Sequence, residues 1–518
     1  MIKIGIDVGG TNTDAVLLDE ADKVIEAIKT HTTKDIQSGI NTAVAKILKK
    51  SNVDPNDIKQ AMLGTTQCTN AIVERKDLAR VGVLRLGFPA TQSVEPYTEW
   101  PDDITRKLSG KFAIVSGGYE FNGETIADLN FQEIKKILLS WKNKIDSVAI
   151  IGVFSAINNK QENEVTQLVR EVLGPEIPIS VSSKIGSLGL ITRENATILN
   201  SSLYNVIHRV CEGFKGALAE QKVTNASIFI CQNDGTLMST DYAEKYPILT
   251  IGSGPTNSIR GASYLVKKKD ALVLDIGGTT SDIGVLSNGF PRESSIAETV
   301  GGVKTNFRMP DILSVGLGGG SIVRKKSDGT VTVGPDSVGY EIEEKAIVFG
   351  GDIITATDIA VKLGMVKIGD SSLTKKINLS LAKKAFETIK GILSEALDKM
   401  KTSSQQTNLI LVGGGAIIAP LVIEGISQIF KDRYGSVANA IGATIAQISG
   451  ESEKIYQYDL IPREKALNES KNEATNQAIG AGASKNGIRT VEIEEIPLAY
   501  APNDTVRVKV KVVGQIKG

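Results

Sequence analysis

The sequence has few of the residues on which several common kinds of active site depend. It contains two histidines, His31 and His208, among 518 residues. A catalytic zinc site usually takes several imidazole ligands, and a Ser-His-Asp triad needs a well-placed histidine. A zinc-dependent cyclic amidase and a histidine-based hydrolase are therefore poor interpretations of this chain. Each histidine fits a surface or helix-packing position better.

Cysteine, excess charge and long apolar segments are also scarce. The three cysteines, Cys68, Cys211 and Cys231, form no Cys-x-x-Cys pair, which is typical of a reducing cytosol and speaks against a zinc ribbon. Lys plus Arg equals Asp plus Glu, at 59 each, so charge gives no reason to expect nucleic acid or an anionic membrane as a partner. No apolar run approaches the ~20 residues of a membrane span, and the chain begins with a strand rather than a signal peptide. We therefore expect a cytoplasmic protein.

The two most familiar phosphate-binding motifs are missing as well. No Gly-x-x-x-x-Gly-Lys-Ser/Thr sequence occurs, which argues against a P-loop. The two main glycine turns run into strands instead of opening helices, so the Rossmann arrangement does not fit. A nucleotide bound by this chain would therefore lie between two parts of the molecule and not on a single helix N-terminus.

What the chain does contain is one pattern twice. Residues 3–17 and 272–285 each show an apolar strand, the motif Asp-x-Gly-Gly-Thr-x-x-Asp, and a second apolar strand, the spacing of a β-hairpin. Glycines let such a turn take positive φ and let a ligand approach the backbone. Successive N–H groups in the turn form an anion site, and the leading acids, Asp7 and Asp275, suit Mg²⁺ or a polarised water.

A single copy would be interpreted as an ordinary structural turn. Two copies separated by half the chain indicate two related domains that offer their turns to one cleft. This arrangement resembles the actin, hexokinase and heat-shock chaperone superfamily of two-lobed ATPases. The resemblance implies two α/β, RNase H-like lobes with a nucleotide cleft between them, and ATP with Mg²⁺ as cofactors.

A third glycine cluster follows a buried-type strand at residues 408–412. In that superfamily a strand–Gly-Gly-Gly–helix unit at this place packs against adenosine, although a plain tight junction is the alternative. The run from Gly316 to Ser321 also suggests close approach to a ligand, with a lobe hinge as the alternative. The residues we assign to the nucleotide are Gly9, Gly10, Thr11, Asn12, Thr13, Gly277, Gly278, Thr279, Thr280, Ser281, Gly318, Gly319, Gly320, Gly413, Gly414 and Gly415.

The order of elements suggests three ranges. Residues 147–181 alternate strand, amphipathic helix and strand, as in a βαβ unit. We expect residues 1–185 to form the first RNase H-like lobe and residues 186–465 the second. Residues 466–518 should add a helix and a small β appendage, because residues 505–512 alternate apolar and polar side chains strictly.

A narrower resemblance follows from residues 64–75, which read Gly-Thr-Thr-x-x-Thr-Asn-Ala-x-x-Glu-Arg. Together with the turn at residues 251–255 and the run at residues 311–322, this stretch resembles the hydantoinase A/5-oxoprolinase family. Members use ATP to open or activate a cyclic amide, or to carboxylate an aromatic ketone. The resemblance implies that the substrate side consists of Thr65, Thr66, Asn70, Glu74 and Arg75. Leu63 and Leu317 depart from the family pattern, which affects the choice of substrate more than the ATP site.

The expected function is therefore ATP-dependent hydrolysis or activation of a small cyclic amide or imide through phosphorylation of the amide oxygen. Asp7 and Asp275 are the expected catalytic and metal-binding residues. A second hydantoinase-type subunit and a homo-oligomer are expected partners. The alternatives are a small-molecule kinase of the same superfamily and a chaperone-like reactivating ATPase.

Overall fold

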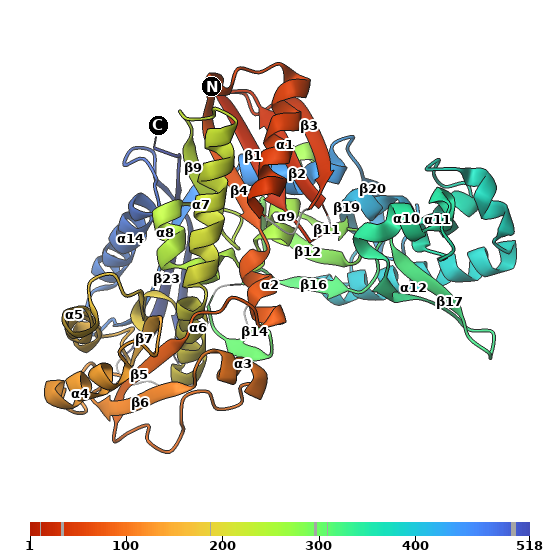
Figure 1. Cartoon of the computed structure of the whole chain (residues 1–518). Coiled ribbons are helices and arrows are strands. Elements are labelled where there is room, and N and C mark those ends of the chain that lie inside the picture. The colour runs from red at the N-terminus through yellow and green to blue at the C-terminus, as the bar shows by residue number, and fades with distance from the viewer. Residues whose placement is uncertain are drawn as a thin grey trace.

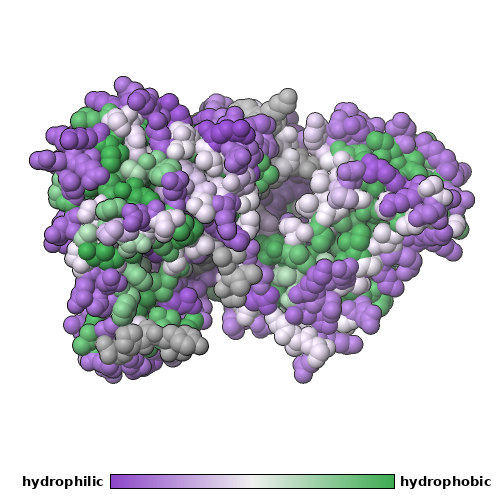
Figure 2. Space-filling model, turned by 90° about the horizontal axis from the view of Figure 1, so that it is seen from below, coloured by the Kyte–Doolittle hydropathy of each residue, from purple (hydrophilic) through white to green (hydrophobic). Residues whose placement is uncertain are grey.

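We describe a computed structural model that covers residues 1–10, 12–32, 36–186, 188–294, 298–307, 309–498 and 504–517. The chain forms two α/β bodies that meet at helix α9 (Ser253–Val266). The first body, on the left in Figure 1, contains the N-terminus and the C-terminal strands. Seen from below, the surface is hollowed between the two bodies (Figure 2).

The first body is built on a nine-stranded sheet in the order β22-β23-β21-β10-β9-β4-β1-β2-β3. Alternating and continuous apolar runs favour these strands, and most of their side chains lie in one large core. The strands are β1 (Ile2–Val8), β2 (Asn12–Leu18), β3 (Val24–His31), β4 (Ile58–Thr65), β9 (Ser227–Cys231), β10 (Leu237–Ser239), β21 (Ile448–Gln457), β22 (Arg489–Pro497) and β23 (Thr505–Gly514).

The second body, on the right in Figure 1, contains a six-stranded sheet in the order β13-β12-β11-β19-β20, with β16 also paired to β12. The two-stranded pair β17–β18 also belongs to this body, whereas the pair β14 (Glu298–Val300) and β15 (Val303–Thr305) packs on α2 (Gln67–Glu74) and α6 (Leu190–Ser202) of the first body. The strands of the second body are β11 (Ala271–Ile276), β12 (Ser281–Ser287), β13 (Phe290–Pro291), β16 (Ile312–Val315), β17 (Ser321–Lys325), β18 (Val331–Ser337), β19 (Thr407–Val412) and β20 (Ile426–Phe430).

The two sheets share one topology. In the first, β1 pairs antiparallel with β2 and parallel with β4, and β4 pairs parallel with β9. In the second, β11 pairs antiparallel with β12 and parallel with β19, and β19 pairs parallel with β20. This is the strand order of an RNase H-like fold, and it confirms the expected fold class. The first sheet is longer because β10, β21, β23 and β22 continue it beyond β9.

Helices cover both sheets. Helix α1 packs on β2, β3 and α7, and α14 packs on β21 and β23, because each presents an apolar face to its sheet. Helices α6 (Leu190–Ser202) and α7 (Tyr204–Glu220) are consecutive and are separated by a break at Leu203. The helices are α1 (Ile36–Ser51), α2 (Gln67–Glu74), α3 (Asp102–Lys107), α4 (Phe131–Trp141), α5 (Lys160–Leu173), α6 (Leu190–Ser202), α7 (Tyr204–Glu220), α8 (Thr240–Lys245), α9 (Ser253–Val266), α10 (Ile342–Lys345), α11 (Ala356–Lys362), α12 (Leu379–Met400), α13 (Ala438–Thr444) and α14 (Arg463–Gly480).

Residues 81–181 form a separate parallel sheet in the order β6-β5-β7-β8. Its strands are β5 (Val81–Phe88), β6 (Lys111–Ser116), β7 (Ser147–Gly152) and β8 (Ile179–Val181). The buried ion pair between Arg85 and Glu194, at 2.6 Å, fixes this sheet to α6. The arrangement differs from the single lobe expected for residues 1–185, because distant strands complete the first sheet. The ranges 1–185, 186–465 and 466–518 stay predictions of domain boundaries.

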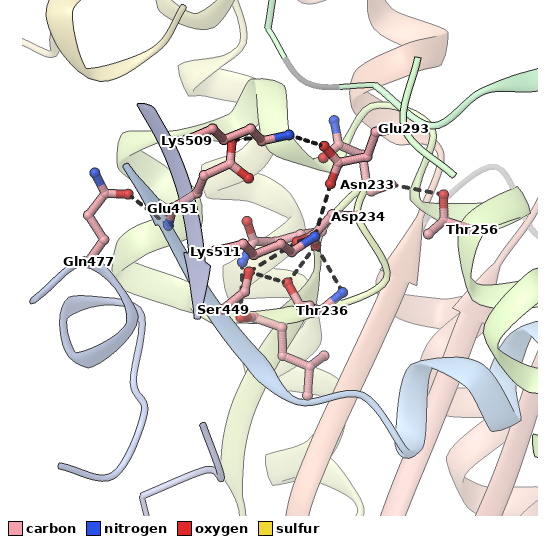
Figure 3. Close-up of polar contacts among 12 residues, drawn as sticks. Asn233, Asp234, Thr236, Thr256, Glu293, Ser449, Glu451, Gln477, Lys509 and Lys511 are labelled. Carbon is pink, nitrogen blue, oxygen red and sulfur yellow. Dashed lines mark hydrogen bonds and ion pairs between the residues drawn. The ribbon is translucent and has the colours of Figure 1, made fainter. Parts of the chain in front are cut away.

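The C-terminal hairpin β22–β23 is joined to the rest of the first sheet through β21. Two lysines of β23 connect it to the second body (Figure 3). Lys511 Nζ lies 3.1 Å from Asp234 Oδ2 and 2.9 Å from Glu293 Oε1, and Lys509 Nζ lies 2.9 Å from Glu293 Oε2. Glu293 follows β13 of the second sheet, so this ion network ties the two bodies together.

The network is buried, and neighbouring hydroxyl groups donate hydrogen bonds to its Asp234 carboxylate. Asp234 is 2% exposed and Lys511 is 5% exposed. The Thr236 hydroxyl donates to Asp234 Oδ1 at 2.5 Å and the Ser449 hydroxyl to Asp234 Oδ2 at 3.0 Å. Removing one charge from such a network leaves its partners buried and uncompensated, which costs far more than losing a surface pair.

We therefore expect Lys511→Met to lower the free energy of unfolding by about 3 kcal/mol, measured by urea and thermal denaturation. Lys399→Met is the matched control, because Lys399 pairs with Glu395 on an exposed face of α12. It should change stability by less than about 0.5 kcal/mol. Equal effects of the two substitutions would show that the Lys511 network does not stabilise the fold.

Candidate active site

The two sequence motifs form matching hairpins. In the first, the Gly9 N–H donates to the Asn12 carbonyl at 3.0 Å, and in the second the Gly277 N–H donates to the Thr280 carbonyl at 2.9 Å. Asp7 pairs with Asp14 across one hairpin, and Asp275 pairs with Asp282 across the other. Thr11, at the tip of the first motif, lies outside the described residues. The same turn therefore occurs twice, as the repeated motif predicts.

Asp7 lies at the end of β1 and is only 3% exposed. Its Oδ1 accepts a hydrogen bond from the Asn257 amide at 3.3 Å, and its Oδ2 accepts one from the Asn439 amide at 3.0 Å. Burial, together with the negative charge of Asp14, raises the pKa of Asp7 to about 6. The hydrogen bonds from the two amides lower the pKa, and the charge of Asp275 raises it. Asp7 is thus a buried carboxylate whose two amide partners carry no charge.

Asp275 occupies the equivalent end of β11. The Ser258 hydroxyl donates to its Oδ2 at 2.5 Å. Burial raises the pKa of Asp275, the bond from Ser258 and the charge of Lys29 lower it, and the charge of Asp14 raises it. Lys29 and Asp14 belong to the first sheet, so charged groups of the first lobe affect the pKa of a carboxylate in the second hairpin.

Helix α9 shows directly that the hairpins face each other. Its adjacent residues Asn257 and Ser258 contact Asp7 and Asp275 respectively. Helix α13 packs so closely on α9 that neither Gly261 nor Gly442 has room for a side chain. A Cβ on Gly261 would lie 1.8 Å from the Ala438 carbonyl oxygen, and a Cβ on Gly442 would lie 1.9 Å from the Asn257 carbonyl oxygen. The crossing helices therefore hold both carboxylates at one place between the lobes.

Two glycines make room for the carboxylates. A Cβ on Gly64 of β4 would lie 2.2 Å from Asp7 Oδ1, and one on Gly413, after β19, would lie 2.2 Å from Asp275 Oδ1. Gly413 also has a φ of +88°, which favours glycine. The two glycines occupy related places in the two lobes, each at the end of the strand parallel to the one that carries the acid.

The three glycine clusters of the second lobe stack on one another. The Gly319 N–H donates to the Gly277 carbonyl at 3.0 Å, and the Gly320 N–H donates to the Gly278 carbonyl at 2.7 Å. The Gly318 N–H donates to the Ser321 hydroxyl at 2.8 Å. These three N–H groups are already bonded within the protein, so here the glycine run serves to support the second hairpin turn.

Gly413 to Gly415 pack against that same turn. A Cβ on Gly415 would lie 2.3 Å from the Gly277 carbonyl oxygen, whereas the space around Gly414 is open. In the first turn the space around Gly10 is also open. The hydroxyls of Thr13 and Ser281 are buried and bonded to Thr32 and to the Leu317 carbonyl respectively. A nucleotide role for the assigned residues of these turns and clusters stays a prediction.

The substrate-side residues divide into two groups. Thr65 ends β4, and Thr66 directs its hydroxyl to the Val8 carbonyl at 3.5 Å and accepts from Asn70 at 3.4 Å. These three residues lie beside the first hairpin. The Ser253 hydroxyl of α9 donates to the Thr65 carbonyl at 3.3 Å, so they also lie beside the start of α9.

Glu74 and Arg75 lie at the other end of α2. Glu74 pairs with Lys76 on the surface at 2.7 Å. Arg75 has a φ of +56° and directs its guanidinium to Asp103, to the Gly301 carbonyl and to the Ile72 carbonyl. The structure therefore separates these two residues from Thr66 and gives Arg75 a structural role. Their assignment to a substrate stays a prediction that these contacts do not support.

Sequence reasoning missed several residues that contact the two acids. Asn257, Ser258 and Asn439 have no repeated motif that would mark them. Gly64 belongs to a quoted motif, but its closeness to Asp7 depends on the parallel pairing of β1 with β4. Asp14 and Asp282 end the repeated motif in both copies, which was a signal that could have singled them out.

Two features of the described residues concern metals and membranes. No three His, Cys, Asp or Glu side chains gather there in a way that could hold a metal ion. No helix in the same part of the chain is long and apolar enough to cross a membrane.

Comparison with known proteins identifies the family. A model described as the hydantoinase/oxoprolinase N-terminal region matches residues 3–173, and one described as hydantoinase/oxoprolinase matches residues 193–396. The matches occur in the order expected from the sequence motifs and together include both hairpins, α9 and the glycine run at residues 316–321.

Curated relatives carry related names. The chain is 26% identical to caprolactamase subunit alpha of Pseudomonas jessenii over 76% of its own length. It is 23% identical to acetophenone carboxylase gamma subunit of Aromatoleum aromaticum over 70% of its length, and 23% identical to 5-oxoprolinase of Saccharomyces cerevisiae over 88%. The chain spans 59%, 53% and 41% of these three relatives.

Solved structures show the same fold. The ATP-dependent caprolactamase from Pseudomonas jessenii aligns with a TM-score of 0.80 at 19% identity, covering 99% of this chain and 88% of that one. The nucleotide-free acetone carboxylase aligns with a TM-score of 0.68 at 17% identity, covering 100% and 88%. With both family models matched in order and this fold in common, the chain belongs to the hydantoinase/oxoprolinase family.

Proposed function

We propose that this protein binds ATP between its two hairpins and uses it to activate a small cyclic amide or imide. The observation that carries the proposal is the pair of adjacent contacts on α9, from Asn257 to Asp7 and from Ser258 to Asp275. They bring two glycine turns of anion-binding type to the same cleft from opposite lobes. Such a site suits a chain of phosphates better than a single compact anion.

The carboxylates fit a divalent cation. Asp7 is buried beside Asp14 with amides as its hydrogen-bond partners, and its pKa is raised to about 6. A cation would relieve this repulsion. Because no three candidate ligands cluster in the described residues, Mg²⁺ would take oxygens from water and phosphate besides Asp7 and Asp275. It would supply charge neutralisation to phosphoryl transfer.

The proposed reaction overcomes the low reactivity of an amide carbonyl. The amide oxygen attacks the γ-phosphorus of ATP, the bond to the β-phosphate oxygen breaks, and ADP leaves. The resulting imidate phosphate has an electrophilic carbon, to which water adds. The ring C–N bond then breaks as the nitrogen takes a proton, and a second water attacks the carbon of the acyl phosphate so formed, releasing a carboxylate and phosphate. For the first step the protein has to position the reactants and offset charge, and needs no nucleophile of its own.

The proposed substrate class is supported by the relatives. Among the names of similar proteins are a caprolactamase and a 5-oxoprolinase, which are named for a lactam and for oxoproline. Two relatives are named as subunits. Because this chain spans only part of them, we further propose that a second subunit takes part and completes hydrolysis.

The direct test measures ADP release by the purified protein with Mg²⁺ and a panel of hydantoins, oxoproline, lactams and aromatic ketones. We expect at least one cyclic amide to stimulate ADP release, with oxygen-18 from the amide carbonyl found in the phosphoryl group of the product or in released phosphate. A stable product phosphorylated at a group other than the amide oxygen would indicate a kinase instead. No binding of ATP and no turnover with any substrate would contradict the proposal.

The two acids should be needed for turnover and not for folding. We expect Asp7→Asn and Asp275→Asn each to lower ATP turnover at least about tenfold, because each removes charge from the cation site. Circular dichroism and gel filtration should be unchanged. Asp328→Asn, in the exposed turn between β17 and β18, serves as the control. Full activity of both cleft variants would refute the metal assignment.

Asp7 should also make the ligand-free protein less stable at neutral pH. Its pKa is raised from 3.8 to about 6, so the folded state binds the proton more tightly than the unfolded state. The ionised group therefore destabilises the fold progressively as pH rises through this range. In EDTA, we expect Asp7→Asn to stabilise the protein by about 3 kcal/mol at pH 8.

The same substitution should give a much smaller gain at pH 4.5, where Asp7 of the folded wild-type protein is mostly protonated. Thermal melts of both proteins at the two pH values measure the difference. A gain that does not depend on pH would show that the effect comes from packing and not from the buried charge.

A further inference from the structure

Three neighbouring strands of the first lobe carry a row of charged side chains. Asp7 of β1 is opposite Asp14 of β2, and Asp14 is opposite Lys29 of β3. Directly opposite residues of antiparallel strands point to the same face. Lys29 Nζ lies 2.5 Å from Asp14 Oδ1. The row therefore runs from the proposed cation ligand to a lysine.

The second lobe carries the same row with one change. Asp275 of β11 is opposite Asp282 of β12, and Asp282 is opposite Ser314 of β16. The Ser314 hydroxyl donates to Asp282 Oδ1. By position in the two hairpins, Ser314 is the equivalent of Lys29. A hydroxyl occupies the place where the first lobe has an ammonium group.

This difference distinguishes two possible roles of Lys29: donating a hydrogen bond to Asp14, or supplying a positive charge. If the second acid of each motif only needed a hydrogen-bond donor, a serine would suffice, as it does at Asp282. In the part of the chain that the structure describes, Asp282 accepts a hydrogen bond from the Ser314 hydroxyl and makes no ion pair. A hydroxyl partner is therefore enough for this acid in the second lobe, so the charge of Lys29 needs a further reason.

Lys29 is placed to act across the cleft. Its side chain is 33% exposed, whereas that of its partner Asp14 is 3% exposed. Asp14 is directly opposite Asp7, and the α9 residue that contacts Asp7 is adjacent to the one that contacts Asp275. The ammonium group bonded to Asp14 therefore lies near the region between the two hairpins, where the proposed function places the triphosphate.

The chemistry of that region requires positive charge. The two rows contribute four carboxylates, Asp7, Asp14, Asp275 and Asp282, on the walls of a site proposed for a polyanion. In phosphoryl transfer, negative charge spreads over the oxygens of the moving group. A cationic side chain that meets this charge as it develops favours the transition state over the ground state.

We propose that Lys29 is a catalytic residue that shifts its ammonium group from Asp14 to the transferring phosphoryl group of ATP. This inference rests on the proposed function. Asp14 holds the lysine in the cleft while no nucleotide is bound. Lys29 then offsets phosphate charge together with Mg²⁺, and the asymmetry between the lobes marks the first lobe as the one that contacts the γ-phosphate.

Lys29→Ser tests the proposal, because it gives the first lobe the side chain that the second lobe already has. We expect the variant to fold and to bind Mg·ATP less than about tenfold more weakly, with turnover of ATP reduced about 100-fold. Lys29→Arg, which keeps the charge, should recover part of the turnover. Measurements are calorimetric ATP binding, single-turnover ADP formation and thermal melts.

Lys3→Ser is the matched control, because Lys3 lies at the far end of the same sheet and pairs with Asp22 at 2.7 Å. It should leave turnover unchanged. If Lys29→Ser kept the turnover of the wild-type protein, Lys29 would be only a partner of Asp14 and the inference would be overturned. If the wild-type protein neither bound nor hydrolysed ATP, the proposed function itself would fail, a result separate from that of the variants.

Discussion

The structure depends on one arrangement, in which α9 contacts a buried carboxylate of each lobe through two adjacent side chains. Asn257 and Ser258 share one turn of helix, so Asp7 and Asp275 cannot move far apart while both hydrogen bonds are made. Every other feature of the cleft is arranged around this pair. The hairpin turns follow the two acids in sequence. Gly64, next to the last residue of β4, and Gly413, directly after β19, lie at the ends of the parallel strands that flank the acids.

Keeping these acids buried is unfavourable for the isolated protein. Asp7, Asp14, Asp275 and Asp282 all have raised pKa values, and burial is the largest cause for each. Groups of this kind are common where a ligand completes the site. In the proposed function, a cation and the phosphates with their counter-charges would complete this one. The Lys511 network joins the same two bodies beside α9, since the Thr256 hydroxyl of that helix donates to the carbonyl of Asn233, next to Asp234.

Glycine has two distinct uses around the cleft. At Gly64, Gly413, Gly261 and Gly442 it allows a carboxylate or a second helix to approach the backbone closely. In residues 318–320 it allows the backbone N–H groups to bond the carbonyls of the second hairpin turn. Open space remains at Gly10 and Gly414, so the glycine-rich sequence is partly a packing device and partly an open surface in the cleft.

The sequence by itself determined the repeated hairpins, their RNase H-like setting and the family. These follow from contiguous residues, because a hairpin's turn and register are local and its apolar alternation selects one face. Only the tertiary structure decided which side chains meet the acids. Asn257 and Asn439 lie 250 and 432 positions from Asp7 in the chain, and Lys29 meets Asp14 through strand pairing. For Arg75 the sequence motif suggested a substrate site, whereas in the structure its guanidinium bonds to Asp103 and to backbone carbonyls. Contacts of such long range depend on how helices cross and lobes meet, which no local pattern encodes.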